Sequence, residues 1–437
     1  MKRSSLSLLL CVVVTSEALA QPLSVEHVVL IGLQKNYDIR LAQNTVALAI
    51  NDSRFSFGLF TPNLNAFGSY TRNVIDARTQ LFNDSIINRP GANFSNVNSS
   101  LQMAWTVFDG TRMFTTRKRL NENEAFFALS AKNQMVNSTA SIINNYYGIV
   151  RQKQQLKAVQ EQTSVSEERV KLAERKLQVG TGGKPELLQA KVDLNAFRTA
   201  AIQQETLIQQ LKDQLNFLVG MGLPDGYDIS DTIPIHMGIT LAAIMENVEN
   251  SNTSLVAIKK NIRVAELMLR ESRTGRSPIV NLNASLLLNR REDELQANPF
   301  STKSSRTQGY NYGLSMSIPI MNGMNVNRNI GASKVNLERQ KLLYDAQLSV
   351  VLSSIRVAFT SYENAIKVLQ IEEQNILLAR ENVIIMLEGF RRGITTFIEL
   401  RTAQQSLADA YNRLIAARFN AKLSETELLR LQGSLIH

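Results

Sequence analysis

The feature that most constrains this fold is an internal duplication, because a chain written twice builds two copies of one supersecondary unit. A shift of about 216 residues aligns the start of the two halves, and a shift of about 213 residues aligns their later parts. The matches include Ser24 with Thr240, Pro62 with Pro278, Gly110 with Gly323, Gly180 with Gly393 and Gly220 with Gly433. We therefore expect a first repeat over 21–220, a linker over 221–238, a second repeat over 239–433 and a C-terminal end over 434–437.

Residues 1–20 have the pattern of a secretory signal peptide. Lys2 and Arg3 precede a short apolar run over 6–14, and small residues at 18–20 offer a cleavage site. Downstream, no segment approaches about 18 uninterrupted apolar residues, so we expect no transmembrane helix. The pattern predicts a protein that leaves the cytoplasm.

Several function classes lack support in the sequence. The net charge of +10 is spread along the chain, which argues against nucleic-acid binding. His27, His236 and His437 lie far apart without cysteine partners, so we expect no metal site. The glycine-rich segment 180–184 lacks the spacing of a phosphate loop. We expect no cofactor and no enzymatic activity.

Each half predicts the order helix, strand, loop, strand, very long helix, turn, helix. Proline is absent from 110–179 and from 325–392, and either run could extend about 100 Å as a helix. Apolar residues in the return helices step by three and four, from Leu187 to Leu218 and from Leu400 to Leu431. This heptad spacing predicts antiparallel coiled-coil hairpins.

The predicted strands alternate apolar and polar residues. They are Asn63–Asn73, Val97–Phe108, Ile279–Arg290 and Tyr310–Met321, joined in pairs by long polar loops over Val74–Asn96 and Arg291–Gly309. A soluble sheet with one wet face shows the same alternation. The signal peptide and the long helices favour a membrane barrel instead, with Trp105, Tyr310 and Tyr312 on the lipid side.

Four strands cannot close a membrane barrel, because the smallest bacterial barrels have about eight. Other subunits must therefore complete it. Two chains would give eight strands and an interior filled by side chains, whereas three would give twelve strands and room for a passage.

The two hairpin tips read VGTGGKPELLQA over 179–190 and RGITTFIELRTA over 392–403. Gly180 and Gly393 are expected to end the long helices. Thr396 and Glu399 fit a capping box, and Glu186 takes the equivalent place in the other tip. Capping suffices to explain both glutamates, and a second role at a pore mouth remains open.

The signal peptide, the two halves, the order of elements, the paired tips and the Leu-x-Gly ending of each half together resemble the TolC-type outer-membrane efflux protein family. The resemblance implies a mixed α and β membrane protein. Its expected form is a homotrimer with a twelve-strand outer-membrane β-barrel continuous with a periplasmic α-helical barrel. The resemblance also implies docking to a periplasmic adaptor protein and to an inner-membrane pump of the RND or ABC type.

The resemblance assigns roles to residues of both tips. It implies that Gly180, Gly393 and Glu186 contact the adaptor and that Glu399 lines the periplasmic constriction. It places Phe390, Arg391 and Arg392 at the gate.

The function that follows is a passive outer-membrane channel, the exit duct of a tripartite efflux or type I secretion system. A periplasmic coiled-coil scaffold or adhesin without a pore is the alternative. The channel should need detergent for extraction and the scaffold should not.

Overall fold

The computed structural model describes residues 22–224, 226–294 and 302–436, so the expected signal peptide and His437 lie outside the described residues. The described part divides into two compact units. The sheet unit comprises residues 44–129 and 254–347. The helical unit comprises the described residues of 1–43, 130–253 and 348–437.

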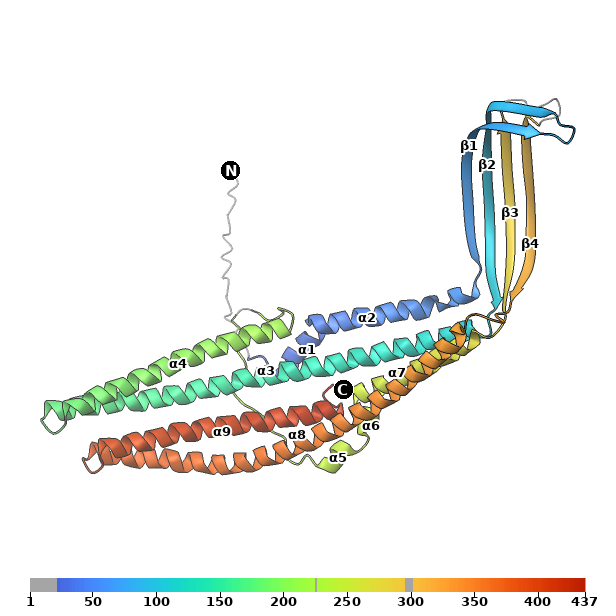
Figure 1. Cartoon of the computed structure of the whole chain (residues 1–437). Coiled ribbons are helices and arrows are strands. Elements are labelled where there is room, and N and C mark those ends of the chain that lie inside the picture. Colours follow the sequence, from blue (N-terminus) through green and yellow to red (C-terminus); the bar gives the residue numbers. More distant parts are fainter. Residues whose placement is uncertain (1–21, 225, 295–301, 437) are drawn as a thin grey trace, which may run out of the picture. The chain divides into compact units, whose positions relative to one another are not determined.

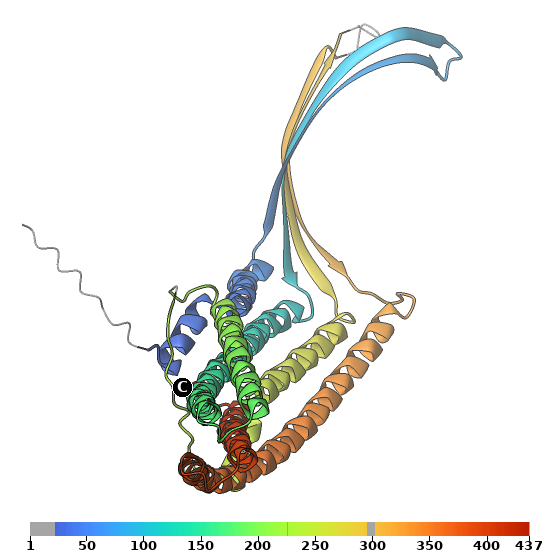
Figure 2. The same cartoon turned by 90° about the vertical axis from the view of Figure 1, so that its left-hand side faces the viewer.

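The sheet unit contains one antiparallel sheet in the order β1-β2-β3-β4, which curves along its length (Figure 2). The strands are β1 (Asn63–Gln80), β2 (Ile86–Phe108), β3 (Ile279–Asp293) and β4 (Ser304–Ser317). The register places Leu101 opposite Leu286, and Leu286 opposite Tyr310. Because residues opposite one another share a face, one face of the sheet is apolar. Its large side chains are exposed.

The other face of the sheet carries a ladder of polar side chains. Ser285 donates a hydrogen bond to Asn311 at 2.7 Å, and Asn283 donates to Ser315 at 3.1 Å. Thr106 donates to Asn281 at 2.9 Å. One apolar and one polar face is the pattern of a sheet that separates lipid from water.

The strands are longer than the sequence analysis predicts, and the predicted loops Val74–Asn96 and Arg291–Gly309 are wrong. Most of the first segment is strand, and in the second the described residues 291–293 and 304–309 are strand, whereas β4 ends before Ile318. Pro90 and Gly91 lie at a register shift, where Gly91 N–H donates to Asp76. A bulge tolerates a proline because that residue makes no ladder bond. Backbone pairing thus continues where side-chain alternation has stopped.

The helices of the chain are mostly long. They are α1 (Val25–Lys35), α2 (Tyr37–Arg54), α3 (Arg112–Gln178), α4 (Lys184–Leu218), α5 (Leu241–Met245), α6 (Val248–Ser251), α7 (Thr253–Thr274), α8 (Asn325–Arg391) and α9 (Phe397–Gln432), with a short 3-10 helix η1 (Phe55–Phe60). In the helical unit α3 and α4 form one antiparallel hairpin and α8 and α9 form another (Figure 1). Both hairpin tips lie at the same end of this unit.

Heptad seams hold each hairpin together. Val170 and Ala173 of α3 pack with Ala190 and Leu194 of α4. The seam between α8 and α9 is longer and includes Leu369, Ile376, Val383, Ala403, Leu407, Ala410 and Leu414. The small alanine side chains let the helix backbones approach closely, which confirms the predicted coiled-coil pairing.

Each return helix ends on a buried asparagine. Asn36, between α1 and α2, donates to the carbonyl of Leu218 at 2.6 Å and accepts from Ile39 N–H at 3.0 Å. Asn252, between α6 and α7, donates to the carbonyl of Leu431 at 2.8 Å. The two asparagines occupy matching places in the duplication, and each satisfies a carbonyl that the helix end leaves open.

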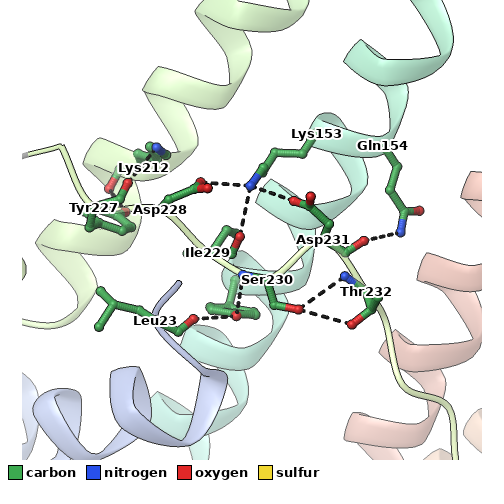
Figure 3. A network of polar contacts seen from close by, with 11 residues as sticks. Leu23, Lys153, Gln154, Lys212, Tyr227, Asp228, Ile229, Ser230, Asp231 and Thr232 are labelled. Atoms are coloured by element: carbon green, nitrogen blue, oxygen red, sulfur yellow. Dashed lines mark hydrogen bonds and ion pairs between the residues drawn. The ribbon is translucent and has the colours of Figure 1, made fainter. Parts of the chain in front are cut away.

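The inter-repeat linker is tied to α3 by a polar network (Figure 3). Lys153 pairs with Asp228 at 2.8 Å and Asp231 at 2.6 Å, and it donates to the carbonyl of Ile229. The hydroxyl of Tyr146 donates to the carbonyl of Leu23 and accepts from Ser230 N–H. Burial lowers the pKa of Lys153, but hydrogen bonds to the two aspartates outweigh it and raise that pKa. These hydrogen bonds and ion pairs therefore hold the linker against α3.

By length and composition alone, one described helix, α8, contains an 18-residue window apolar enough to cross a membrane. Only 17% of that window is buried. The window is apolar yet mostly exposed because α8 carries apolar side chains on two faces. One face forms the seam with α9, and the other displays Val350, Val357, Ile371, Leu378 and Ile385 to solvent at intervals of seven residues or multiples of seven.

Gly220 offers a test of the helix-end packing. Its φ is +69°, and an added Cβ would lie 2.3 Å from the carbonyl oxygen of Lys35. Gly226 has a similar φ of +72° but open space around it. We expect Gly220→Ala to cost about 1–2 kcal/mol for the left-handed backbone and about 1–3 kcal/mol more for the clash. Gly226→Ala should show only the first cost.

Thermal unfolding followed by circular dichroism measures the difference. The melting temperature of Gly220→Ala should fall well below that of Gly226→Ala. Equal melting temperatures would contradict the close approach of Lys35 to this helix end.

Candidate functional site at the hairpin tips

The tip between α3 and α4 is a glycine turn. Gly180 has a φ of +77°, which favours glycine because other residues are strained there. The N–H groups of Thr181 and Gly182 both donate to the carbonyl of Lys176 at 2.9 Å and close the end of α3. Helix α4 then begins after Gly183 without a side-chain cap, and Glu186 lies half-buried in its first turn.

The tip between α8 and α9 has the same glycine turn but a different start to its return helix. Gly393 has a φ of +76°, and Ile394 N–H donates to the carbonyl of Gly389 at 2.8 Å. The predicted capping box is confirmed. Glu399 accepts from Thr396 N–H at 2.7 Å, and Thr396 Oγ1 accepts from Glu399 N–H at 3.3 Å.

The capping box also sets the charge of Glu399. The hydrogen bond from Thr396 N–H, followed by that from the Thr396 hydroxyl, lowers the pKa of this carboxyl group. Glu399 is therefore ionised at neutral pH, and its side chain is exposed. Exposed Ile394 and Ile398 lie beside it in the sequence. The tip thus carries an exposed carboxylate and two exposed isoleucines.

The three residues before this tip have different environments. Phe390 is only 2% exposed, and the ammonium of Lys176 lies 3.6 Å from the centre of its ring. Arg391 pairs with Glu388 at 2.7 Å, whereas Arg392 is exposed. Phe390 therefore links the α8–α9 hairpin to α3. A role of these residues in a gate stays a prediction.

Sequence reasoning missed a buried polar cluster that joins the two hairpins. Arg169 of α3 is 1% exposed, pairs with Asp193 of α4 at 2.6 Å and donates to Gln404 of α9 at 2.7 Å. Arg401 of α9 also pairs with Asp193, at 3.2 Å. The guanidinium of Arg169 lies 5.1 Å from the ring centre of Phe397. One buried cation of α3 thus contacts two other helices, α4 and α9, just behind both tips.

A signal for this cluster is present in the sequence. Buried residues of α3 recur at Ala158, Gln162, Ser166, Arg169 and Ala173, which is heptad spacing filled mainly by polar side chains. Both polar atoms of the Gln162 side chain and the hydroxyl of Ser166 have no hydrogen-bond partner among the described residues. A search for apolar periodicity passes over such a seam.

The predicted lipid-facing aromatic residues share one face of the sheet. Tyr310 and Tyr312 are highly exposed, and Tyr312 lies opposite Ala284. Trp105 lies opposite Leu282, is 36% exposed, and donates from Nε1 to the carbonyl of Phe60 at 2.9 Å. The indole therefore has a fixed orientation with its ring on the apolar face.

No group of three or more His, Cys, Asp or Glu side chains is placed to hold a metal ion within residues 22–224, 226–294 and 302–436. The polar groups at the tips cap helices and join hairpins. The tips therefore present charged and apolar side chains at the end of two long helical hairpins.

Comparison with known proteins gives consistent matches. The sequence pattern of the family described as outer membrane efflux protein matches residues 32–221 and 244–434. The chain is 19% identical over 349 residues to the outer membrane protein TolC of Salmonella enteritidis, covering 79% of this chain and 70% of that protein. It is 19% identical over 287 residues to the alkaline protease secretion protein AprF of Pseudomonas aeruginosa, covering 64% of this chain and 58% of that protein.

Solved structures of outer-membrane channels have a similar fold. The outer membrane channel CmeC of Campylobacter jejuni superposes with a TM-score of 0.76 at 15% identity, covering 94% of this chain and 85% of that chain. The related proteins are channels, which points away from enzymatic activity. Because the family pattern matches both halves of the duplication, the chain belongs to the outer membrane efflux protein family and is an outer-membrane exit channel for efflux or secretion.

Proposed function

We propose that three copies of this chain form one duct, with a twelve-strand barrel in the outer membrane and a helical tunnel in the periplasm. The observation that carries the proposal is the open sheet. Strands β1 and β4 each have only one neighbour within the described chain. Unpaired backbone groups at such an edge cost several kcal/mol each in lipid, so β4 of one copy must pair with β1 of the next.

The helical unit supports the same closure. Helix α8 displays its exposed stripe of Val350, Val357, Ile371, Leu378 and Ile385. Helix α4 displays Leu188, Val192 and Ile202. We propose that the α8 stripe of one copy packs on the α4 stripe of the next. Asn364 lies within the α8 stripe, and a polar residue in such a seam fixes its register.

The number three follows from geometry. Two chains supply eight strands, and a barrel of that size is filled by its own side chains. Three chains supply twelve strands, which leaves space for a passage. A head-to-tail contact that closes on itself gives a ring, as both units require.

The tips suggest the partners. Gly180, Gly393 and Glu186 lie at turns that end the helical unit, where a periplasmic adaptor could reach them. No source of energy is apparent within the described chain, so an inner-membrane pump must drive the export. AprF is named for protease secretion and CmeC for a channel, so both secretion and efflux systems are consistent with this role.

Replacement of stripe residues tests the assembly. Leu378 is 66% exposed within the stripe, and its neighbour Leu377 is 64% exposed but points about 100° away around the helix. We expect Leu378→Lys to dissociate the trimer, because it places an unpaired charge in an apolar seam. Leu377→Lys makes the same chemical change outside the seam and should leave the trimer intact.

Light scattering in detergent and heat-modifiable gel migration measure the trimer fraction. Dissociation by both variants alike would exclude the stripe as the contact. A wild-type protein that is monomeric or dimeric in detergent, or that extracts without detergent, would overturn the proposed duct in favour of the soluble scaffold.

Trp105 tests the lipid side of the sheet. Its ring lies on the apolar face beside Leu282 and Leu314 in the register. We expect lipid-attached quenchers in reconstituted vesicles to quench the fluorescence of this single tryptophan, because its face meets the membrane. Quenching by aqueous iodide alone would place the face in water.

Glu399 tests the pore mouth. Three ionised carboxylates around one axis would raise the local cation concentration. Glu399→Gln keeps an acceptor for the capping box and removes the charge, so we expect lower cation over anion permeability and an intact trimer. Because its pKa is lowered in the folded protein, Glu399 should keep this effect in the wild type until the pH falls below the range in which an ordinary glutamate protonates.

Single-channel reversal potentials under a salt gradient measure the selectivity, with Glu186→Gln as the matched variant on the other tip. We expect a smaller shift for Glu186→Gln. Identical reversal potentials in the wild type and Glu399→Gln would leave Glu399 with a capping role alone.

A further inference from the structure

One row of side chains crosses all four strands at the far end of the apolar face. The register places Tyr70 opposite Val97, Val97 opposite Arg290, and Arg290 opposite Arg306. All four side chains are exposed. The row lies eight residues from the Trp105 row along β2, which is about 26 Å at about 3.3 Å per residue.

Strands of outer-membrane barrels tilt by about 35–45°, so this separation covers about 19–22 Å along the membrane normal, most of the height of an apolar band. Apolar bands of outer-membrane barrels are about 25 Å tall and are bordered by aromatic residues on both sides. Trp105 borders the apolar face at the end near η1, and Tyr70 borders it at the other end. On the proposed function, the row of Tyr70, Val97, Arg290 and Arg306 therefore lies at the outer interface of the membrane.

The unusual feature of the row is its pair of arginines. Like charges directly opposite one another on neighbouring strands are destabilising. Glu292 pairs with Arg290 at 2.5 Å, whereas Arg306 has no ion pair within residues 22–224, 226–294 and 302–436. In the next row along β1, Arg72 forms an ion pair with Glu294 at 3.1 Å. The chain thus neutralises Arg72 and leaves excess positive charge at the Arg290–Arg306 pair.

We propose that Arg290 and Arg306 together bind a phosphate group of an outer-leaflet lipid headgroup. The planar forks of two adjacent guanidinium groups match the oxygens of one phosphate, and such charge-assisted bonds are strong. An anion between them would also relieve their mutual repulsion. The apolar band directly below, formed by residues such as Leu286, Leu288 and Tyr310, would contact the acyl chains of the same lipid.

The chain contains a matched control. Arg291 follows Arg290 in β3, but its side chain lies on the opposite face, 4.4 Å from the ring centre of Phe94. Arg291→Gln removes the same charge from the same strand without touching the proposed site. Comparison of Arg306→Gln with Arg291→Gln therefore separates a specific site from general electrostatic attraction.

The experiment is native mass spectrometry of the detergent-solubilised protein titrated with bisphosphorylated lipid A. Dephosphorylated lipid A and zwitterionic phosphatidylcholine serve as the comparison lipids. We expect the wild type to bind the phosphorylated lipid preferentially. Arg306→Gln should weaken that binding about threefold and the Arg290→Gln/Arg306→Gln pair about tenfold. Arg291→Gln should bind as the wild type does.

Three results would overturn the site: equal losses in Arg306→Gln and Arg291→Gln, equal binding of the dephosphorylated lipid, or no loss in the double variant. If the double variant does not assemble, the comparison of the two single variants decides. Assembly of the wild type is measured in the same spectra. A detergent-dependent trimer whose arginine variants keep the lipid would contradict only this inference, whereas a wild type that binds no lipid and needs no detergent would contradict the proposed function itself.

Discussion

The constraint on which this structure depends is the pairing of backbone groups at the edges of its sheet. Inside a bilayer no water is available to satisfy an open edge, so a four-stranded sheet cannot exist there alone. The chain supplies four strands in the order β1-β2-β3-β4 and leaves both outer edges without a partner in the described residues. The proposed trimer is a consequence of that arrangement.

The helical unit meets the same problem with side chains in place of backbone groups. Helix α8 uses one heptad seam within the chain and presents a second one to solvent. A helix with two seams belongs between two neighbours, so a single chain leaves the outer one uncovered. The open sheet edges and the exposed α8 stripe are therefore both completed in the proposed trimer by a neighbouring copy of the chain, the first through backbone hydrogen bonds and the second through apolar packing.

The seam that joins the two hairpins is of another kind. It holds Arg169 and Gln404 in place of leucine, and several of its buried polar atoms lack partners among the described residues. Buried polar groups weaken an interface when they are incompletely satisfied, whereas apolar seams do not carry that cost. Apolar seams thus dominate within the hairpins, whereas the contact between them near the tips adds buried polar groups, and Arg169 also pairs with Asp193 inside the α3–α4 hairpin.

The sequence by itself determined the duplication, the long helices, the capping box of Glu399 and the membership of the apolar face. Those features follow from local rules such as heptad spacing, strand alternation and glycine or threonine at helix ends. Only the tertiary structure decided how far the strands extend, because backbone ladders continue through Pro90 and Gly91 where the side-chain pattern has ended. It also brought Asn36 to Leu218, buried Arg169 of α3 against α4 and α9, and set Arg290 opposite Arg306. Contacts between residues distant in the chain depend on register and packing, and a local pattern carries no information about either.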